Sequence, residues 1–300
     1  MYDIIIIGAG PAGLSAALYA RGAMKKVLVL EALNYGGAIV NTLKIANYPT
    51  IASISGFDFA TNFYNQVKNL GAEIKFEEVL KLENLKSYKK IVTNQNVYET
   101  KTVIIATGCK NKNLGLENEE KFIGNGISYC ATCDGLFFQN KEVAIVGGGN
   151  TAVQDALYLT DICKKVYLIL RKNNFRAEAS LVSKLKEKKN IEFIYNSNIT
   201  KINGSDSLES IEYIDDKKQK YDLKISALFI AIGRVPQNET FKNIIEIDDD
   251  GYILSDENCH TNIDGIYVAG DCRKKDLRQL VTATSDGAIA AIEAINYLNN

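Results

Sequence analysis

Two cysteines lie two residues apart in the segment SYCATCDG, residues 128–135 of the 300-residue chain. A pair at this spacing can bind a metal, form a structural disulfide or exchange electrons as a dithiol. A structural zinc site needs four ligands, usually supplied as two close pairs. Only Cys130 and Cys133 have this spacing, and His260 is the only histidine. We therefore expect no metal site at these cysteines.

The remaining composition indicates a reducing compartment. Four isoleucines follow Met1–Asp3, so the N-terminus lacks the basic start and long apolar run of a secretory signal. No apolar stretch approaches the roughly 18 residues that span a bilayer. We therefore expect a soluble, cytoplasmic protein, in which a disulfide framework is disfavoured and isolated cysteines are small buried side chains. These are Cys109, Cys163, Cys259 and Cys272.

Because a metal site and a structural disulfide are disfavoured, a redox-active pair remains, and such a pair needs an electron donor. The N-terminal segment YDIIIIGAGPAGLSAALYA predicts a strand, a glycine-rich turn and a helix. Gly8, Gly10 and Gly13 have the spacing that lets backbone approach a pyrophosphate at a helix N-terminus. The next strand, KVLVLE, ends in Glu31, which is suited to accept hydrogen bonds from a ribose. The sequence therefore predicts a dinucleotide site.

The same pattern recurs in the middle of the chain. KEVAIVGGGNTAVQDALYLT again predicts strand, turn and helix, with Gly147, Gly149 and Ala152 in the three fingerprint positions. KKVYLILRK is the strand that follows. A second dinucleotide site is therefore expected, downstream of the cysteine pair.

The second site differs from the first at the ribose position. Leu170 replaces the acidic residue, and Arg171, Lys172 and Arg176 follow it. A carboxylate there would repel a 2′-phosphate, whereas a guanidinium or an ammonium would bind it. We interpret this site as one for NADPH.

Strands that alternate with helices predict an α/β fold with parallel sheets. Residues 84–101 and 207–224 have the pattern of antiparallel hairpins. The strand GIYVAGD near the C-terminus has no fingerprint of its own, so we expect it to complete the first fold. We predict two Rossmann-like dinucleotide-binding domains, the second inserted in the first. The expected bounds are 1–112 with 244–300, and 113–243.

The motifs GAGPAG, GG at 36–37, ATG, CATCDG, GGGNTA, FRAE and AGD occur in the order found in low-molecular-weight, bacterial-type thioredoxin reductases. The chain resembles this family from Tyr2 to the final helix. The resemblance implies FAD on the first domain and NADPH on the inserted one, which carries the cysteine pair. It also implies a homodimer with thioredoxin as the protein partner. A net charge of −1 favours neither nucleic acid nor an acidic membrane surface.

The resemblance also implies residue roles. Cys133 is the cysteine nearer the flavin, Cys130 attacks the disulfide of thioredoxin, and Asp134 protonates the departing thiolate. The residues implied to face FAD are Gly8, Gly10, Gly13, Glu31, Gly37, Asn47, Gly108, Asp271 and Gln279. Those implied to face NADPH are Gly147, Gly149, Ala152, Arg171, Lys172 and Arg176. Because the disulfide and the nicotinamide need the same flavin, we also expect the two domains to rotate about their connections.

The chain departs from the family pattern H-R-R-x-x-x-R at Leu170 and Lys172. A lysine cannot make the planar bidentate contact of an arginine. Two alternatives therefore stay open. One is the same reductase with ferredoxin or NADH as electron donor, and the other is a non-catalytic sensor that binds FAD and opens its disulfide.

Overall fold

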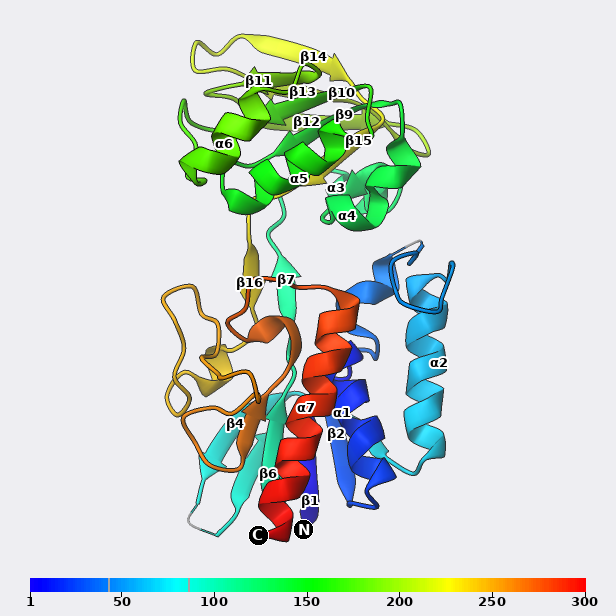
Figure 1. Ribbon diagram of the computed structural model, residues 1–300, viewed down its shortest axis with the longest axis vertical. Coiled ribbons are helices and arrows are strands. Elements are labelled where there is room, and N and C mark those ends of the chain that lie inside the picture. Colours follow the sequence, from blue (N-terminus) through cyan, green and yellow to red (C-terminus); the bar gives the residue numbers. More distant parts are fainter. Residues whose placement is uncertain (43, 86) are drawn as a thin grey trace. The chain divides into compact units, whose positions relative to one another are not determined.

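The structure is a computed structural model that describes residues 1–42, 44–85 and 87–300. The chain divides into two compact units. Unit 1 consists of Met1–Lys110 and Val235–Asn300, and unit 2 is the intervening segment Asn111–Arg234. The predicted α/β fold, with a second fold inserted in the first, is confirmed (Figure 1).

The second unit boundary lies earlier than the sequence placed it, at Val235 instead of residue 244. Residues 235–243 belong to unit 1, because Phe241 is buried in the same apolar cluster as Ile5 and Leu28. The chain passes between the units at β7 (Cys109–Asn111) and β16 (Arg234–Pro236), which pair as a two-stranded sheet.

Unit 1 is built on a seven-stranded sheet in the order β3-β2-β1-β6-β5-β4, with β17 also paired to β6. The strands are β1 (Tyr2–Ile7), β2 (Val27–Glu31), β3 (Glu73–Phe76), β4 (Val79–Asn84), β5 (Lys89–Thr93), β6 (Val97–Ile105) and β17 (Ile266–Val268). The pairs β4–β5 and β5–β6 are antiparallel, and the remaining pairs are parallel. β17 therefore completes the first fold, as expected.

The run of isoleucines in β1 is buried on both faces of this sheet. Ile4 and Ile6 pack in one apolar cluster, and Ile5 and Ile7 pack in another. Such double burial is typical of parallel strands and explains the lack of apolar–polar alternation.

Three long helices accompany the sheet of unit 1. They are α1 (Pro11–Gly22), α2 (Gly56–Asn69) and α7 (Leu280–Asn299), and the short 3-10 helices are η1 (Gly37–Asn41), η3 (Glu239–Phe241) and η4 (Gly270–Cys272). α7 runs beside α1 (Figure 1). The two helices approach closely at Gly287, where a Cβ atom would lie 2.1 Å from the carbonyl oxygen of Ala12.

Unit 2 contains a parallel five-stranded sheet in the order β11-β10-β9-β15-β8, and a three-stranded antiparallel sheet, β12-β13-β14. Its strands are β8 (Ile127–Ser128), β9 (Glu142–Val146), β10 (Lys165–Ile169), β11 (Ile191–Ile194), β12 (Asn198–Gly204), β13 (Leu208–Ile214), β14 (Lys220–Lys224) and β15 (Ala227–Ile230). Its helices are α3 (Glu119–Phe122), α4 (Ala131–Asp134), η2 (Gly135–Phe138), α5 (Asn150–Thr160) and α6 (Ala179–Lys186). Within the described residues, none of the chain's helices is long and apolar enough to cross a membrane.

Candidate active site

Cys130 and Cys133 form a disulfide at the one-turn helix α4 of unit 2. Their Cα atoms are 5.3 Å apart, inside the range of about 4.4–6.8 Å that a disulfide bridges. The carbonyl oxygen of Cys130 accepts hydrogen bonds from the N–H groups of Cys133 (3.2 Å) and Asp134 (3.1 Å). The helical turn therefore holds the two sulfur atoms within bonding reach, and the structure joins the pair that the sequence singled out.

Asp134 is the last residue of α4, and its carboxyl group is partly buried. Burial raises the pKa of this carboxyl, and a hydrogen bond from Ser128 acts in the opposite direction. The Ser128 hydroxyl donates to Oδ2 of Asp134 at 2.6 Å. An aspartate with a raised pKa next to a cysteine pair has the property required of a general acid.

The first glycine turn joins β1 to α1. A Cβ at Gly8 would lie 2.3 Å from the carbonyl oxygen of Ala106, and one at Gly13 would lie 1.9 Å from that of Gly8. Packing therefore requires these two glycines. At Gly10 the nearest atom would be Gly37 Cα, 3.9 Å away, and no side chain caps the helix that follows. The open space and the first N–H groups of α1 fit a dinucleotide phosphate.

Glu31 lies at the end of β2 and bonds back to this turn. Its carboxylate accepts hydrogen bonds from the N–H groups of Ala9 (2.8 Å) and Leu33 (3.0 Å). A carboxylate can accept about four hydrogen bonds, so two sites stay available for ribose hydroxyls. Glu31 therefore also holds the turn, which the sequence did not indicate.

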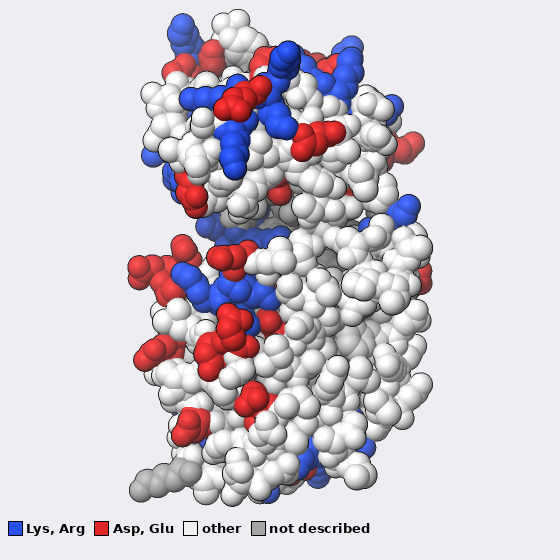
Figure 2. All heavy atoms as spheres, viewed as in Figure 1, with Lys and Arg blue, Asp and Glu red and all other residues white. Residues whose placement is uncertain are grey.

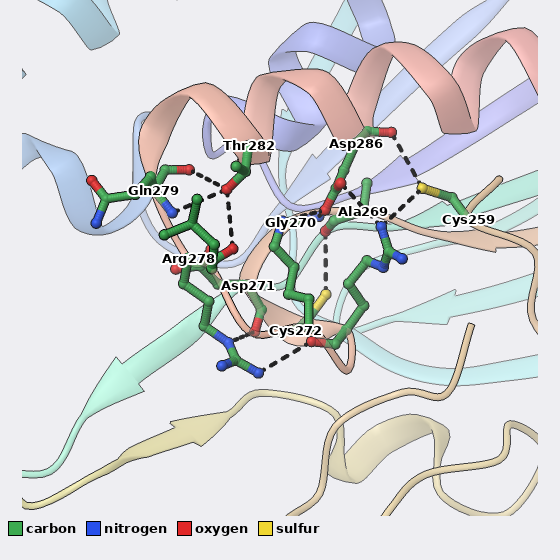
Figure 3. Close-up of polar contacts among 12 residues, drawn as sticks. Cys259, Ala269, Gly270, Asp271, Cys272, Arg278, Gln279, Thr282 and Asp286 are labelled. Atoms are coloured by element: carbon green, nitrogen blue, oxygen red, sulfur yellow. Dashed lines mark hydrogen bonds and ion pairs between the residues drawn. The ribbon is translucent and has the colours of Figure 1, made fainter. Parts of the chain in front are cut away.

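Asn47 and Gln279, both expected to face FAD, meet in unit 1. The Asn47 amide donates to Oε1 of Gln279 at 3.3 Å, although the residues are 232 positions apart in the sequence. Gln279 is the N-cap of α7 and forms a capping box with Thr282 (Figure 3). Gly108, another predicted residue, has a φ of +67° and open space where a Cβ would lie.

Asp271 lies in the turn η4, which contacts a buried cluster of ion pairs centred on Asp286. Asp286 of α7 accepts hydrogen bonds from the Gly270 N–H (2.9 Å), Arg273 (3.0 Å) and Lys275 (2.7 Å) (Figure 3). One carboxylate thus contacts residues on both sides of Asp271, the backbone of Gly270 before it and the side chains of Arg273 and Lys275 after it. No sequence pattern indicated this cluster.

The second glycine turn repeats the first within unit 2. A Cβ at Gly147 would lie 2.3 Å from the carbonyl oxygen of Ala231 and 2.9 Å from Cβ of Ala152, which is fully buried. At Gly149, the N-cap of α5, a Cβ would meet no atom within 4 Å. Packing accounts for Gly147, and the space at Gly149 fits a second phosphate.

The chain matches the family described as pyridine nucleotide-disulphide oxidoreductase over residues 2–287. The chain belongs to this family. A thioredoxin reductase of Listeria monocytogenes is 38% identical over 302 residues, covering 99% of this chain and 94% of that protein. The crystal structure of thioredoxin reductase from Streptococcus pyogenes has 39% identity, a TM-score of 0.95 and coverage of 100% and 98%. The structure of thioredoxin reductase from Giardia duodenalis has 35% identity and a TM-score of 0.94, and the match covers 100% of this chain and 99% of that chain.

In this oxidoreductase, the three basic residues predicted to bind the 2′-phosphate lie in the loop between β10 and α6. Arg171, Lys172 and Arg176 are all exposed, and within the described residues none forms an ion pair. The backbone N–H of Arg176 donates to the carbonyl oxygen of Gly148 at 2.7 Å, which places the loop beside the glycine turn. Leu170, which departs from the family pattern, is 1% exposed, and its side chain packs in the core.

The isolated cysteines of this oxidoreductase are mostly buried, as expected, and they are Cys163, Cys259 and Cys272. Cys109 is only partly buried, and its Sγ donates to the backbone oxygen of Asp271 at 2.8 Å.

Ser128 was not predicted from the sequence, although it lies two residues before Cys130 and its hydroxyl contacts Asp134. The available signal was a small hydroxyl residue at the end of a strand, three residues before the start of a helical turn.

Proposed function

We propose that the chain is a thioredoxin reductase. It passes electrons from NADPH through FAD and the Cys130–Cys133 disulfide to the disulfide of thioredoxin. The observation that carries this proposal is the disulfide on α4 with Asp134 at its end, in a chain that also has two glycine turns. Relatives at 35–39% identity that bear this name support it.

FAD is proposed to bind unit 1. Bound flavin would accept a hydride from the nicotinamide and supply two electrons to the disulfide. Gly10 leaves room for the pyrophosphate, Glu31 has acceptor sites for a ribose, and the Asp286 cluster fixes the turn of Asp271. The proposed FAD residues are those named from the resemblance: Gly8, Gly10, Gly13, Glu31, Gly37, Asn47, Gly108, Asp271 and Gln279.

NADPH is proposed to bind unit 2 at the second glycine turn. Gly149 leaves room for its pyrophosphate, and the loop with Arg171, Lys172 and Arg176 carries exposed cations for the 2′-phosphate. Gly147 and Ala152 complete the turn. Leu170 stands where the first site has Glu31, so this position supplies no carboxylate, and the leucine side chain packs in the core.

At the disulfide, Cys133 is proposed to be the cysteine nearer the flavin and Cys130 the one that attacks thioredoxin. Leu136 and Phe137 lie three and four residues after Cys133 and are 60% and 45% exposed. Large apolar side chains on a surface mark interaction sites. We infer that they contribute to the surface on which thioredoxin docks.

We infer that two copies associate through unit 1. A groove between α1, α2 and α7 is lined by apolar side chains that include Leu18, Tyr19 and Ile289. Figure 2 shows few charged residues over these helices. Tyr19→Glu should therefore give monomers in light scattering. Tyr297→Glu, at a similarly exposed tyrosine outside the groove, should leave the dimer intact. Monomeric wild-type protein would exclude the inference.

A cytoplasmic location is also proposed, since four cysteines outside the active pair remain as thiols. Fractionation of the producing cells, followed by detection of the chain, tests this location.

Anaerobic titration of the purified yellow protein tests the electron route. NADPH should bleach the flavin, and added thioredoxin disulfide should restore the colour over many turnovers. Bleaching by reduced ferredoxin but by neither nucleotide would favour the ferredoxin-linked alternative. Bleaching by NADPH without thioredoxin turnover would favour the redox sensor.

A further inference from the structure

Ser128 ends β8, and its hydroxyl oxygen lies among three polar groups. It donates to Oδ2 of Asp134 (2.6 Å) and accepts from the N–H of Cys130 (3.0 Å), and the carbonyl oxygen of Cys130 is 3.3 Å away. Ser128 is only 5% exposed. Protein groups, and not bulk water, therefore satisfy this hydroxyl.

A hydroxyl has one hydrogen to donate and two lone pairs that accept. When Asp134 is ionised, the Ser128 hydrogen points to the nearer, charged acceptor, Oδ2. When Asp134 is protonated, the carboxylic hydrogen can point to Ser128 Oγ, and the Ser128 hydrogen can turn to the Cys130 carbonyl. Both protonation states are thus hydrogen-bonded without movement of a heavy atom.

We propose that Ser128 is a positioning residue that allows Asp134 to hold and release a proton beside the Cys130–Cys133 pair. The inference deepens the proposed function and rests on it. When an attacking thiolate donates its electron pair to one sulfur of the disulfide, it bonds to that sulfur, the S–S bond breaks and the other cysteine sulfur leaves as a thiolate. Asp134 transfers its proton to that thiolate, giving a thiol and a carboxylate, and the Ser128 hydrogen turns from Cys130 to the new carboxylate. Oxidation of the dithiol reverses these transfers.

The other titratable side chains near this turn lie on neighbouring segments. α5 packs against α4 and carries Asp155 and Tyr158, and Tyr129 lies between Ser128 and Cys130. Burial is the main influence on the pKa of Asp134, and the Ser128 hydrogen bond is the one that opposes it. Loss of the Ser128 hydroxyl should therefore raise this pKa further.

The experiment measures reduction of the Cys130–Cys133 disulfide by dithiothreitol in the FAD-bound protein, from acid to alkaline pH. Alkylation and mass spectrometry follow the reaction in wild type and in Ser128→Ala. The ionisation of dithiothreitol cancels in the ratio of the two rates. A lost hydrogen bond to a charged group should move the Asp134 titration upward by about one to two pH units. The variant-to-wild-type ratio should therefore rise by about 10- to 100-fold with increasing pH.

Three controls isolate the contact. Ser197→Ala removes another buried serine hydroxyl of unit 2, which bonds to the Tyr195 carbonyl, and its ratio should not change with pH. Ser128→Thr keeps the hydroxyl and should keep the wild-type profile. In an Asp134→Asn background, Ser128→Ala should no longer alter the pH dependence.

A ratio independent of pH in a folded, FAD-bound Ser128→Ala protein would overturn the proposal. If that variant does not fold, a folded Ser128→Thr protein with an altered profile would overturn it equally. The assay uses neither a nucleotide nor thioredoxin. Failure of the wild type to reduce thioredoxin would thus reject the proposed function while this proton-transfer test still gives its own answer.

Discussion

The backbone N–H of Arg176 donates a 2.7 Å hydrogen bond to the carbonyl oxygen of Gly148, in the second glycine turn. This bond ties the basic loop to the turn that fits a nucleotide phosphate. Because the bond involves only backbone atoms, an alanine at residue 176 can keep it and lose only the guanidinium. The cation can therefore be tested separately from the loop.

We expect Arg171→Ala and Arg176→Ala to raise the KM for NADPH and to leave that for NADH nearly unchanged. A hydrogen bond to a charged group contributes about 1.5–3 kcal/mol, which corresponds to roughly 10- to 150-fold in affinity. Steady-state kinetics with both nucleotides gives the comparison, and the preference for NADPH should weaken with salt. Lys172→Arg should strengthen the binding of NADPH, because it restores a guanidinium that can contact the phosphate through two hydrogen bonds.

Lys184→Ala removes an exposed cation from α6 of the same unit and is the matched control. It should change neither KM. An equal loss for both nucleotides in the Arg171 and Arg176 variants would show that the loop does not read the 2′-phosphate.

The cysteines should differ in the mixed disulfides that they form. Cys133→Ser should leave Cys130 able to form a stable mixed disulfide with thioredoxin, and Cys130→Ser should not form one through Cys133. Both variants should bind FAD and lose thioredoxin reduction. Non-reducing electrophoresis with mass spectrometry identifies the adduct, and an adduct at Cys133 alone would reverse the assignment.

Asp134→Asn keeps the shape of the side chain and removes its ionisable proton. Thiol–disulfide exchange should slow by about 10²- to 10⁴-fold, the usual range for general acid–base catalysis. FAD content, measured from the absorbance of the purified protein, should not change. Stopped-flow traces at the wild-type rate would reduce Asp134 to a residue of the helical turn.

Local sequence was sufficient to predict the two glycine turns, because the residues that form each turn lie close together in the chain. Gly8 and Gly147 have φ values of +111° and +149°, which favour glycine. The strand and helix on either side are marked by apolar runs. The proximity of the two cysteines could also be predicted from local sequence, since one helical turn brings them together.

Contacts between distant segments could not be predicted in this way. Asp286 meets the Gly270 N–H because α7 packs beside the turn, and Asn47 meets Gln279 across 232 positions. The sequence identified Leu170 as an apolar replacement of the acidic residue, but it did not indicate that this side chain packs in the core. These relationships depend on tertiary packing, for which one sequence contains no local signal.

Asp286 should be important for stability as well as for the turn. Its carboxylate and the Arg273 guanidinium are 3.0 Å apart, with side chains only 9% and 6% exposed. Asp286→Ala would leave buried cations without their partner, which typically costs about 3–5 kcal/mol. Urea denaturation should show this loss. Asp276→Ala, at an exposed aspartate nearby, should stay within about 0.5 kcal/mol of wild type.

His260 should make stability depend on pH near neutrality. Its ring nitrogens lie 2.9 Å from Asp256 Oδ2 and 3.2 Å from Glu293 Oε2. The hydrogen bond with Asp256 is the main cause that raises the pKa of His260 above its usual value.

Because the folded pKa of His260 lies above the unfolded value of about 6.5, the stabilisation is complete below about pH 6.5 and is lost as pH rises through the folded pKa. The side chain is 42% exposed, so the contribution should be only about 0–1 kcal/mol. His260→Gln should therefore destabilise the protein at about pH 5.5 and have less effect at about pH 9. Urea denaturation at both pH values measures the difference, and an effect of the substitution that grows toward pH 9 would contradict the assigned sign.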